Sequence, residues 1–111
     1  MILLIENDTI ARTALAEHLR TSGHEVLEAA NAKEALASMP AHRITLVIAD
    51  LDGLEFLESI RQLAPDLPLI LLSSYLQRQA GEALTSKAQY LHKPVRPTAL
   101  ELTVQSVLSS N

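Results

Sequence analysis

Apolar residues along the chain follow two spacings, short continuous runs and a repeat of three to four residues. Three runs, at residues 2–5, 44–49 and 67–73, are almost unbroken Leu, Ile and Val. Such runs are typical of strands that are buried on both faces of a sheet. Two further runs, at residues 25–30 and 89–92, contain more polar residues, so we predict that they form edge strands. The pattern therefore predicts five strands, of which three are central.

Between these runs, apolar residues recur at the three- and four-residue intervals of an amphipathic helix. The residues that define the five segments are Ile10, Ala11, Ala14, Leu15 and Leu19; Ala32, Ala35, Leu36 and Met39; Leu57, Ile60 and Ala64; Leu76, Ala80, Ala83 and Leu84; and Leu100, Val104, Val107 and Leu108. Strict alternation of strands and helices predicts a parallel sheet covered on both faces. We expect an α/β fold, a single doubly wound (βα)5 flavodoxin-like domain over residues 1–111, with strand order 2-1-3-4-5.

Local signals mark where some of these helices begin and end. Asn31 and Glu34 have the spacing of a capping box, and so do Asp52 and Glu55. Gly23 follows the first helical segment, at the position where a glycine commonly ends a helix.

The amino-acid composition and net charge exclude several classes of function. The 111 residues carry a net charge of −4, and the nine Lys and Arg residues are scattered, so no basic stripe for direct nucleic-acid binding is present. The absence of cysteine excludes disulfides, thiol catalysis and zinc–thiolate sites. No apolar run approaches the roughly 20 residues of a membrane span. We therefore expect a cytoplasmic domain that does not contact a membrane.

Polar residues follow the predicted strands, at the sheet edge where doubly wound folds bind ligands. They are Glu6, Asn7, Asp8 and Thr9 after the first strand, Asp50 after the third, Ser73 and Ser74 after the fourth, and Lys93 after the fifth. A carboxylate can accept a phosphoryl group as an acyl phosphate, and oxygen ligands can hold Mg²⁺ beside it. A lysine and a hydroxyl can bind the remaining phosphoryl oxygens. The set indicates phosphoryl chemistry.

Several of these residues also have a structural interpretation. Asp50 could simply begin a turn, but a lone carboxylate after a buried strand is better explained as a site residue. Asp8 and Thr9 could cap the first helix as readily as bind a metal. Asp52 is most simply the cap of the third helix. We expect the four histidines, which lack ligand spacing, to be surface residues: His18, His24, His42 and His92.

Five motifs, in order along essentially the whole chain, resemble the response-regulator receiver family of two-component signalling: "ILLIENDTIAR", "ITLVIAD", "DGLEFLESIR", "LPLILLSSY" and "YLHKPV". The resemblance implies a signalling phosphoacceptor that takes a phosphoryl group, with Mg²⁺, from a histidine kinase or a phosphotransfer domain. It implies no enzyme activity beyond self-phosphorylation and autodephosphorylation. It also implies a partner-binding face, and a route to a homodimer, on helix four, strand five and helix five.

The resemblance assigns roles position by position. The residues it makes reactive or switching are Asp50 as phosphoacceptor, Ser73 as switch hydroxyl, Tyr90 as switch aromatic and Lys93 as the family's lysine. The metal ligands it implies are Glu6, Asn7, Asp50 and the backbone carbonyl of Asp52. It further implies a cis peptide between Lys93 and Pro94.

The chain departs from the family pattern at two places. Asn7 replaces a carboxylate in the acidic pair, and we expect the uncharged amide to lower the affinity for Mg²⁺ by about 1 kcal/mol or more. Only Leu51 separates Asp50 from the "DGLE" motif, so the loop is short. The segment before the fifth strand is also short, which predicts a brief fourth helix.

Two alternatives to a phosphorylated switch stay open. Asn7 and the short loop would suit a phosphorylation-independent pseudo-receiver that acts as an interaction module. The sequence "DLDG" also matches a phosphatase of the haloacid-dehalogenase type, with Asp50 as nucleophile and Asp52 as general acid. The order of motifs opposes that last reading, because the acidic cluster precedes Asp50 instead of following it. Whether the domain acts alone or within a longer protein is open.

Overall fold

The computed structural model describes residues 1–50, 54–73 and 88–109, without the side chains of 54–57 and 73. One sheet contains the strands β1 (Ile2–Ile5), β2 (Val26–Ala29), β3 (Leu46–Asp50), β4 (Leu69–Ser73) and β5 (Ala88–His92). All neighbouring strands pair in parallel, in the order β2-β1-β3-β4-β5. The predicted fold class and strand order are confirmed.

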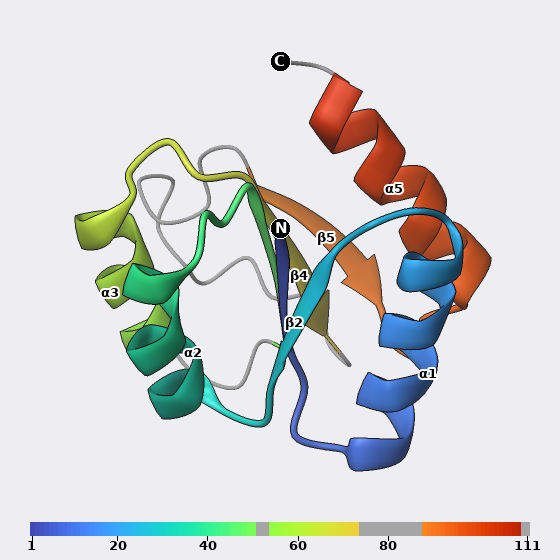
Figure 1. The fold of residues 1–111 in the computed structure, drawn as a ribbon, viewed down its shortest axis with the longest axis horizontal. Helices are drawn as coiled ribbons and strands as arrows, with labels where there is room; N and C mark the ends of the chain where they lie inside the picture. Colours follow the sequence, from blue (N-terminus) through green and yellow to red (C-terminus); the bar gives the residue numbers. More distant parts are fainter. Residues whose placement is uncertain (51–53, 74–87, 110–111) are drawn as a thin grey trace.

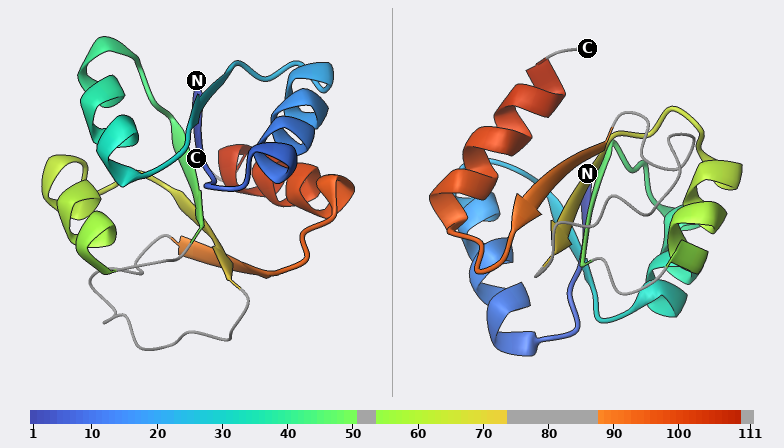
Figure 2. Two further views of the ribbon diagram at one scale, coloured as in Figure 1. Left: turned by 90° about the horizontal axis from the view of Figure 1, so that it is seen from below. Right: turned by 180° about the vertical axis from the view of Figure 1, so that it is seen from behind.

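Helices cover both faces of the sheet (Figure 1). They are α1 (Thr9–Thr21), α2 (Ala32–Ser38), the short 3₁₀ helix η1 (Met39–Ala41), α3 (Leu54–Leu63) and α5 (Pro97–Ser109). Helices α1 and α5 pack side by side on one face, and α2 and α3 lie on the other (Figure 2). The predicted fourth helix falls within residues 74–87, outside the described part of the chain.

The core consists of two aliphatic layers, one on each face of the sheet. Alternate residues of a strand point to opposite faces, so in β1 Ile2 and Leu4 join the layer under α1 and α5. Leu3 and Ile5 join the layer under α2 and α3. Every residue of β1 is buried, whereas β5 carries exposed residues, in agreement with its predicted place at the edge.

Some strand boundaries differ from the predicted ones. The third strand begins at Leu46 and not at residue 44, and the fourth begins at Leu69 and not at residue 67. Before β4, Arg61 donates from Nη1 to the carbonyls of Pro65 and Leu67, at 3.2 and 2.6 Å. These carbonyls are therefore satisfied by a side chain, and the chain enters the sheet later than hydropathy alone predicts.

Helix ends follow the predicted signals where they are described. Gly23 has a φ of +98°, and its N–H donates to the carbonyl of Arg20 while that of His24 donates to Leu19, which is a Schellman motif. Asn31 Oδ1 accepts from the N–H of Glu34 at 2.9 Å and caps α2. The Glu34 carboxylate reaches back to the N–H of Ala30, one residue before the position expected in a capping box.

Two further expectations have different outcomes. The prediction for Asp52 and Glu55 lies outside the described residues and side chains. The prediction that all four histidines lie on the surface holds for His42 and His92, which are exposed, but not for His18 and His24, which are half-buried. His24 contacts α5. Its Nε2 lies 3.2 Å from Glu101 Oε1 on α5, because the turn after α1 carries the ring against that helix.

Within the described ranges, the helices are too short or too polar to cross a membrane.

Candidate functional site

The sheet brings the predicted site residues to one edge. Ile5 pairs with Ala49 in the parallel ladder between β1 and β3. The residue that follows β1, Glu6, therefore lies next to Asp50, the last residue of β3. On the far side of β4, Lys93 directly follows β5.

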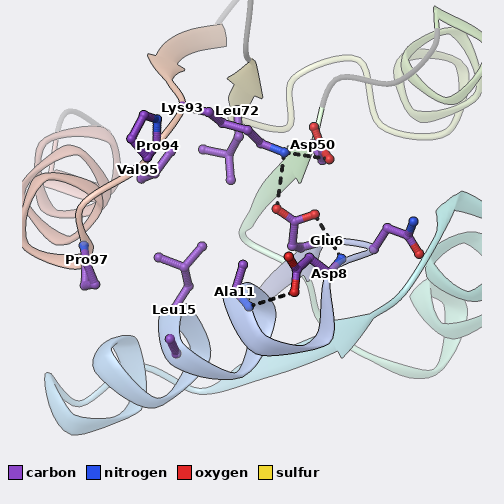
Figure 3. Close-up of a pocket in the computed structure, with 12 residues that line it drawn as sticks. Glu6, Asp8, Ala11, Leu15, Asp50, Leu72, Lys93, Pro94, Val95 and Pro97 are labelled. Carbon is purple, nitrogen blue, oxygen red and sulfur yellow. Dashed lines mark hydrogen bonds and ion pairs between the residues drawn. The ribbon is translucent and has the colours of Figure 1, made fainter.

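Lys93 joins the two carboxylates (Figure 3). Its Nζ lies 2.7 Å from Asp50 Oδ2 and 3.3 Å from Glu6 Oε1, so the side chain reaches across the end of β4. Partial burial would by itself lower the pKa of Lys93. The hydrogen bonds and negative charges of Asp50 and Glu6 outweigh that effect, and the pKa of Lys93 is raised. The lysine is therefore held in its charged form between two carboxylates.

Glu6 is held at each of its polar groups. Its N–H donates to the carbonyl of Ala29 at 3.1 Å. Its carboxylate accepts from the N–H of Asp8 through Oε2, at 3.3 Å, and contacts Lys93 through Oε1. The residue is buried, and a buried carboxylate requires such partners.

Asp8 caps α1. Its Oδ1 accepts from the N–H of Ile10 at 2.9 Å and from that of Ala11 at 3.3 Å, and Thr9 is the first residue of the helix. Of the two interpretations left open for Asp8, the structure displays the capping one.

A pocket of about 650 Å³ lies above this cluster. Glu6, Asn7 and Asp50 line it and offer two carboxylates and one amide oxygen, which are the hard oxygen donors that Mg²⁺ prefers. Asn7 is exposed. Among the residues the structure describes, no three His, Cys, Asp or Glu side chains are grouped to hold a metal, so a Mg²⁺ site here would depend on Asn7.

The other predicted site residues are only partly described. Ser73 ends β4 and pairs with His92, next to Lys93, but its side chain is outside the described part. Asp52 is also outside the described residues. Tyr90 lies on β5 and is exposed. The peptide between Lys93 and Pro94 is cis, as the resemblance implies.

Sequence reasoning missed Arg12. Its Nη1 donates to the carbonyl of Glu6 at 2.8 Å, and its Nε lies 3.3 Å from Glu28 Oε1 on β2. Since Glu28 is 16 residues further along the chain, no local spacing reveals the pair. Only the order of β1 and β2 in the sheet would have suggested it.

A family model described as "Response regulator receiver domain" matches residues 2–105. The chain belongs to the response regulator receiver family. This assignment removes the phosphatase alternative, because the match covers nearly the whole domain. The receiver domain is thus part of the two-component signalling class of proteins.

Curated relatives show the same similarity. The receiver domain is 34% identical over 106 residues to the response regulator protein FleR of Pseudomonas aeruginosa, covering 89% of this chain and 22% of that protein. It is 34% identical to the transcriptional regulatory protein AfsQ1 of Streptomyces coelicolor, covering 96% of this chain and 50% of the relative. An uncharacterized 14.6 kDa protein of Leptolyngbya boryana is 33% identical, with 94% of this chain and 86% of that protein covered. The chain thus spans half or less of the two regulators and most of the third protein.

Solved structures agree with the fold. The chemotaxis response regulator CheY4 of Vibrio cholerae superimposes with a TM-score of 0.85 at 28% identity, with 96% of each chain covered. The receiver domain of the hybrid histidine kinase CckA gives a TM-score of 0.78 at 31% identity, covering 96% of this chain and 97% of that one.

Proposed function

We propose that this receiver domain accepts a phosphoryl group on Asp50 from a phosphohistidine carried by a histidine kinase or a phosphotransfer domain. The observation that supports this most is the position of Lys93, whose amine contacts both Asp50 and Glu6. A single cation between the acceptor and a second carboxylate stands where it can bind the oxygens of an incoming phosphoryl group.

The transfer requires one bond exchange. A carboxylate oxygen of Asp50 attacks the phosphorus atom, a P–O bond forms, and the P–N bond to the imidazole breaks. The imidazole nitrogen takes up a proton from solvent as it leaves. The Lys93 amine then exchanges its contact with the free carboxylate for contacts with the phosphoryl oxygens. Attack of water on phosphorus later releases phosphate and regenerates the Asp50 carboxylate.

Glu6, Asn7 and Asp50 would hold Mg²⁺, with the backbone carbonyl of Asp52 as a further ligand. Bound there, the ion offsets the negative charge of the phosphoryl oxygens. Because Asn7 contributes an amide oxygen and no charge, this domain should bind Mg²⁺ more weakly than a receiver with two carboxylates at the end of its first strand.

Two further roles complete the proposal. We assign the Ser73 hydroxyl to a phosphoryl oxygen and Tyr90 to the switch that responds to it. The support is their position, since Ser73 ends the strand beside β5 and Tyr90 lies on β5 itself. Ser73→Ala should then retain Mg²⁺ binding but slow phosphorylation, and an unchanged rate would remove Ser73 from the mechanism.

The proposal is tested by incubating the domain with Mg²⁺ and either beryllofluoride or acetyl phosphate. We expect a gain of one phosphoryl group by intact-mass analysis, and amide shifts around β3 by NMR with beryllofluoride. Both should be lost in Asp50→Asn and retained in a control variant, Lys33→Met, which changes an exposed lysine on α2. Saturating Mg²⁺ and donor without an adduct would reject the proposal.

A second function, a phosphorylation-independent interaction module, is favoured by one observation. The Lys93 amine already pairs with both carboxylates without a metal, and Asn7 adds no charge to attract one. In that case the same incubation gives no adduct, and a partner binds the wild type and Asp50→Asn equally.

Partners would contact two regions. Ile10 is exposed on the first turn of α1 beside the pocket, where a phosphodonor protein must approach. Ile10→Glu should slow transfer from a phosphotransfer domain without changing the reaction with acetyl phosphate, and equal slowing of both would contradict this contact.

Exposed Tyr90 and Leu102 on β5 and α5 support a homodimer face. A sedimentation experiment with beryllofluoride tests it, because a persistent monomer would exclude the dimer.

A further inference from the structure

Two arginines of α1, Arg12 and Arg20, contact the same carboxylate on β2. Arg12 Nε lies 3.3 Å from Glu28 Oε1, and Arg20 Nη1 lies 2.9 Å from Glu28 Oε2. Each arginine also donates to one backbone carbonyl at 2.8 Å. Arg12 donates to Glu6, and Arg20 donates to Val26. The two residues therefore make the same kinds of contact, but only the carbonyl bound by Arg12 belongs to the candidate site.

Arg12 is the better enclosed of the pair. Its side chain is 17% exposed, against 46% for Arg20, and the Glu28 side chain between them is 29% exposed. The Glu28 carboxylate supplies the negative charge that a partly buried guanidinium needs. Glu28 thus holds Arg12 directed at the turn after β1.

The carbonyl that Arg12 binds determines how Asn7 leaves the sheet. A peptide group is planar, so fixing the carbonyl of Glu6 fixes the plane that carries the nitrogen of Asn7. The preceding peptide plane is fixed as well, because the N–H of Glu6 donates to Ala29. With both planes held, the backbone at Glu6 has little freedom, and the start of Asn7 is fixed with it.

We propose that Arg12 is a positioning residue for the metal-binding turn, held in place by Glu28, and that it orients Glu6 and Asn7 toward a bound Mg²⁺. This inference rests on the proposed function, since it concerns the ion that phosphorylation requires. Positioning by Arg12 is important in this chain because the uncharged Asn7 attracts the ion only weakly. The protein must therefore hold the Asn7 amide in the orientation that binds the ion.

When Arg12 is removed, the loss of its charge and the loss of its hydrogen bond predict opposite changes in Mg²⁺ affinity. Loss of a positive charge near the pocket would by itself strengthen the binding of a cation. Loss of the bond to the Glu6 carbonyl would loosen the turn and weaken binding. The direction of the change in Mg²⁺ affinity therefore separates the two explanations.

The test compares Arg12→Met with Arg20→Met as a matched control, using NMR titrations of the whole domain with MgCl₂. We expect Arg12→Met to weaken Mg²⁺ binding by about tenfold, the size of effect typical for residues that orient metal ligands. Arg20→Met should change it by less than about twofold, because its carbonyl partner lies outside the site. Unchanged or tighter binding in Arg12→Met would overturn the proposal.

Two more variants separate positioning from stability. Arg12→Lys keeps the charge but replaces the separate Nε and Nη1 donors, which reach Glu28 and the Glu6 carbonyl, by a single nitrogen, so Mg²⁺ affinity should recover only in part. Glu28→Gln removes both ion pairs and leaves both donors to backbone carbonyls. It should cost stability with a smaller loss of Mg²⁺ affinity than Arg12→Met causes. If affinity instead follows stability across all four variants, Arg12 is merely structural.

A metal-free measurement keeps this inference distinct from the proposed function. NMR relaxation of the Asn7 backbone amide, measured without metal, should show greater motion in Arg12→Met than in the wild type. In Arg20→Met the motion of this amide should equal that in the wild type. If Arg12→Met does not fold, Arg12→Lys provides the comparison. Equal motion of Asn7 in all variants would refute positioning even where phosphorylation succeeds. Failure of the wild type to bind Mg²⁺ at all would refute both.

Discussion

Replacing Lys93 by Met should destabilise the domain and make its stability depend on Mg²⁺. The change leaves the carboxylates of Glu6 and Asp50 facing the same space without their shared cation. The side chains are 25% exposed for Lys93, 6% for Glu6 and 14% for Asp50, so the cluster lies between a surface pair and a buried one. Removing one partner of a buried pair costs about 3–5 kcal/mol, and an exposed pair contributes about 0–1 kcal/mol. We expect a loss of about 2 kcal/mol in the free energy of unfolding.

Urea unfolding followed by circular dichroism, with and without MgCl₂, measures this loss. A divalent cation can replace the missing ammonium, so Mg²⁺ should stabilise Lys93→Met more than it stabilises the wild type. Lys33→Met on α2 serves as the control and should stay within about 0.5 kcal/mol of the wild type. A loss below about 0.5 kcal/mol in Lys93→Met, or equal stabilisation of both proteins by Mg²⁺, would refute the view that Lys93 holds two carboxylates together.

Three further predictions follow from the same residues. Burial by itself lowers the pKa of Lys93, but its two carboxylate partners raise it by more, so the pKa is raised overall. The stability that Lys93 contributes is therefore complete below the ordinary lysine pKa of 10.5 and is lost as pH rises through the raised value. The stability difference between wild type and Lys93→Met should then stay level from pH 8 to 10 and narrow above that range, and a difference that grows with pH would contradict this sign. Asn7→Asp should tighten Mg²⁺ binding by about 1 kcal/mol, about fivefold in affinity by titration, whereas unchanged affinity would show that Asn7 is not a ligand. Asp8→Ala should cost about 1 kcal/mol in urea unfolding while Asp8→Asn, which can still cap α1, should cost little; a large loss of Mg²⁺ affinity in Asp8→Asn would instead make Asp8 a ligand.

The fold was predictable because its pattern is local and repeated. Continuous apolar runs marked β1, β3 and β4, and the alternation with helices left one natural strand order. The same order placed Glu6, Asp50 and Lys93 at one edge of the sheet, and the ion pairs of Lys93 confirm that they meet.

What the sequence did not reveal depends on contacts between distant segments. The ion pair of Arg12 with Glu28, and the contact of His24 Nε2 with Glu101, each join elements whose side chains have no characteristic spacing. The start of β4 was misplaced for a similar reason, because Arg61 satisfies the carbonyl of Leu67, which hydropathy would place in the strand. A single charged side chain can redirect the backbone without changing the apolar pattern.

Locating the acyl phosphate shows directly whether Asp50 is the phosphoacceptor. The domain is treated with acetyl phosphate and Mg²⁺, reduced with borohydride, which converts an aspartyl phosphate to homoserine, and digested for peptide mass spectrometry. We predict homoserine at position 50, dependent on Mg²⁺ and absent at every other aspartate. Unmodified Asp50 at saturating donor and Mg²⁺, or modification at another residue, would contradict it.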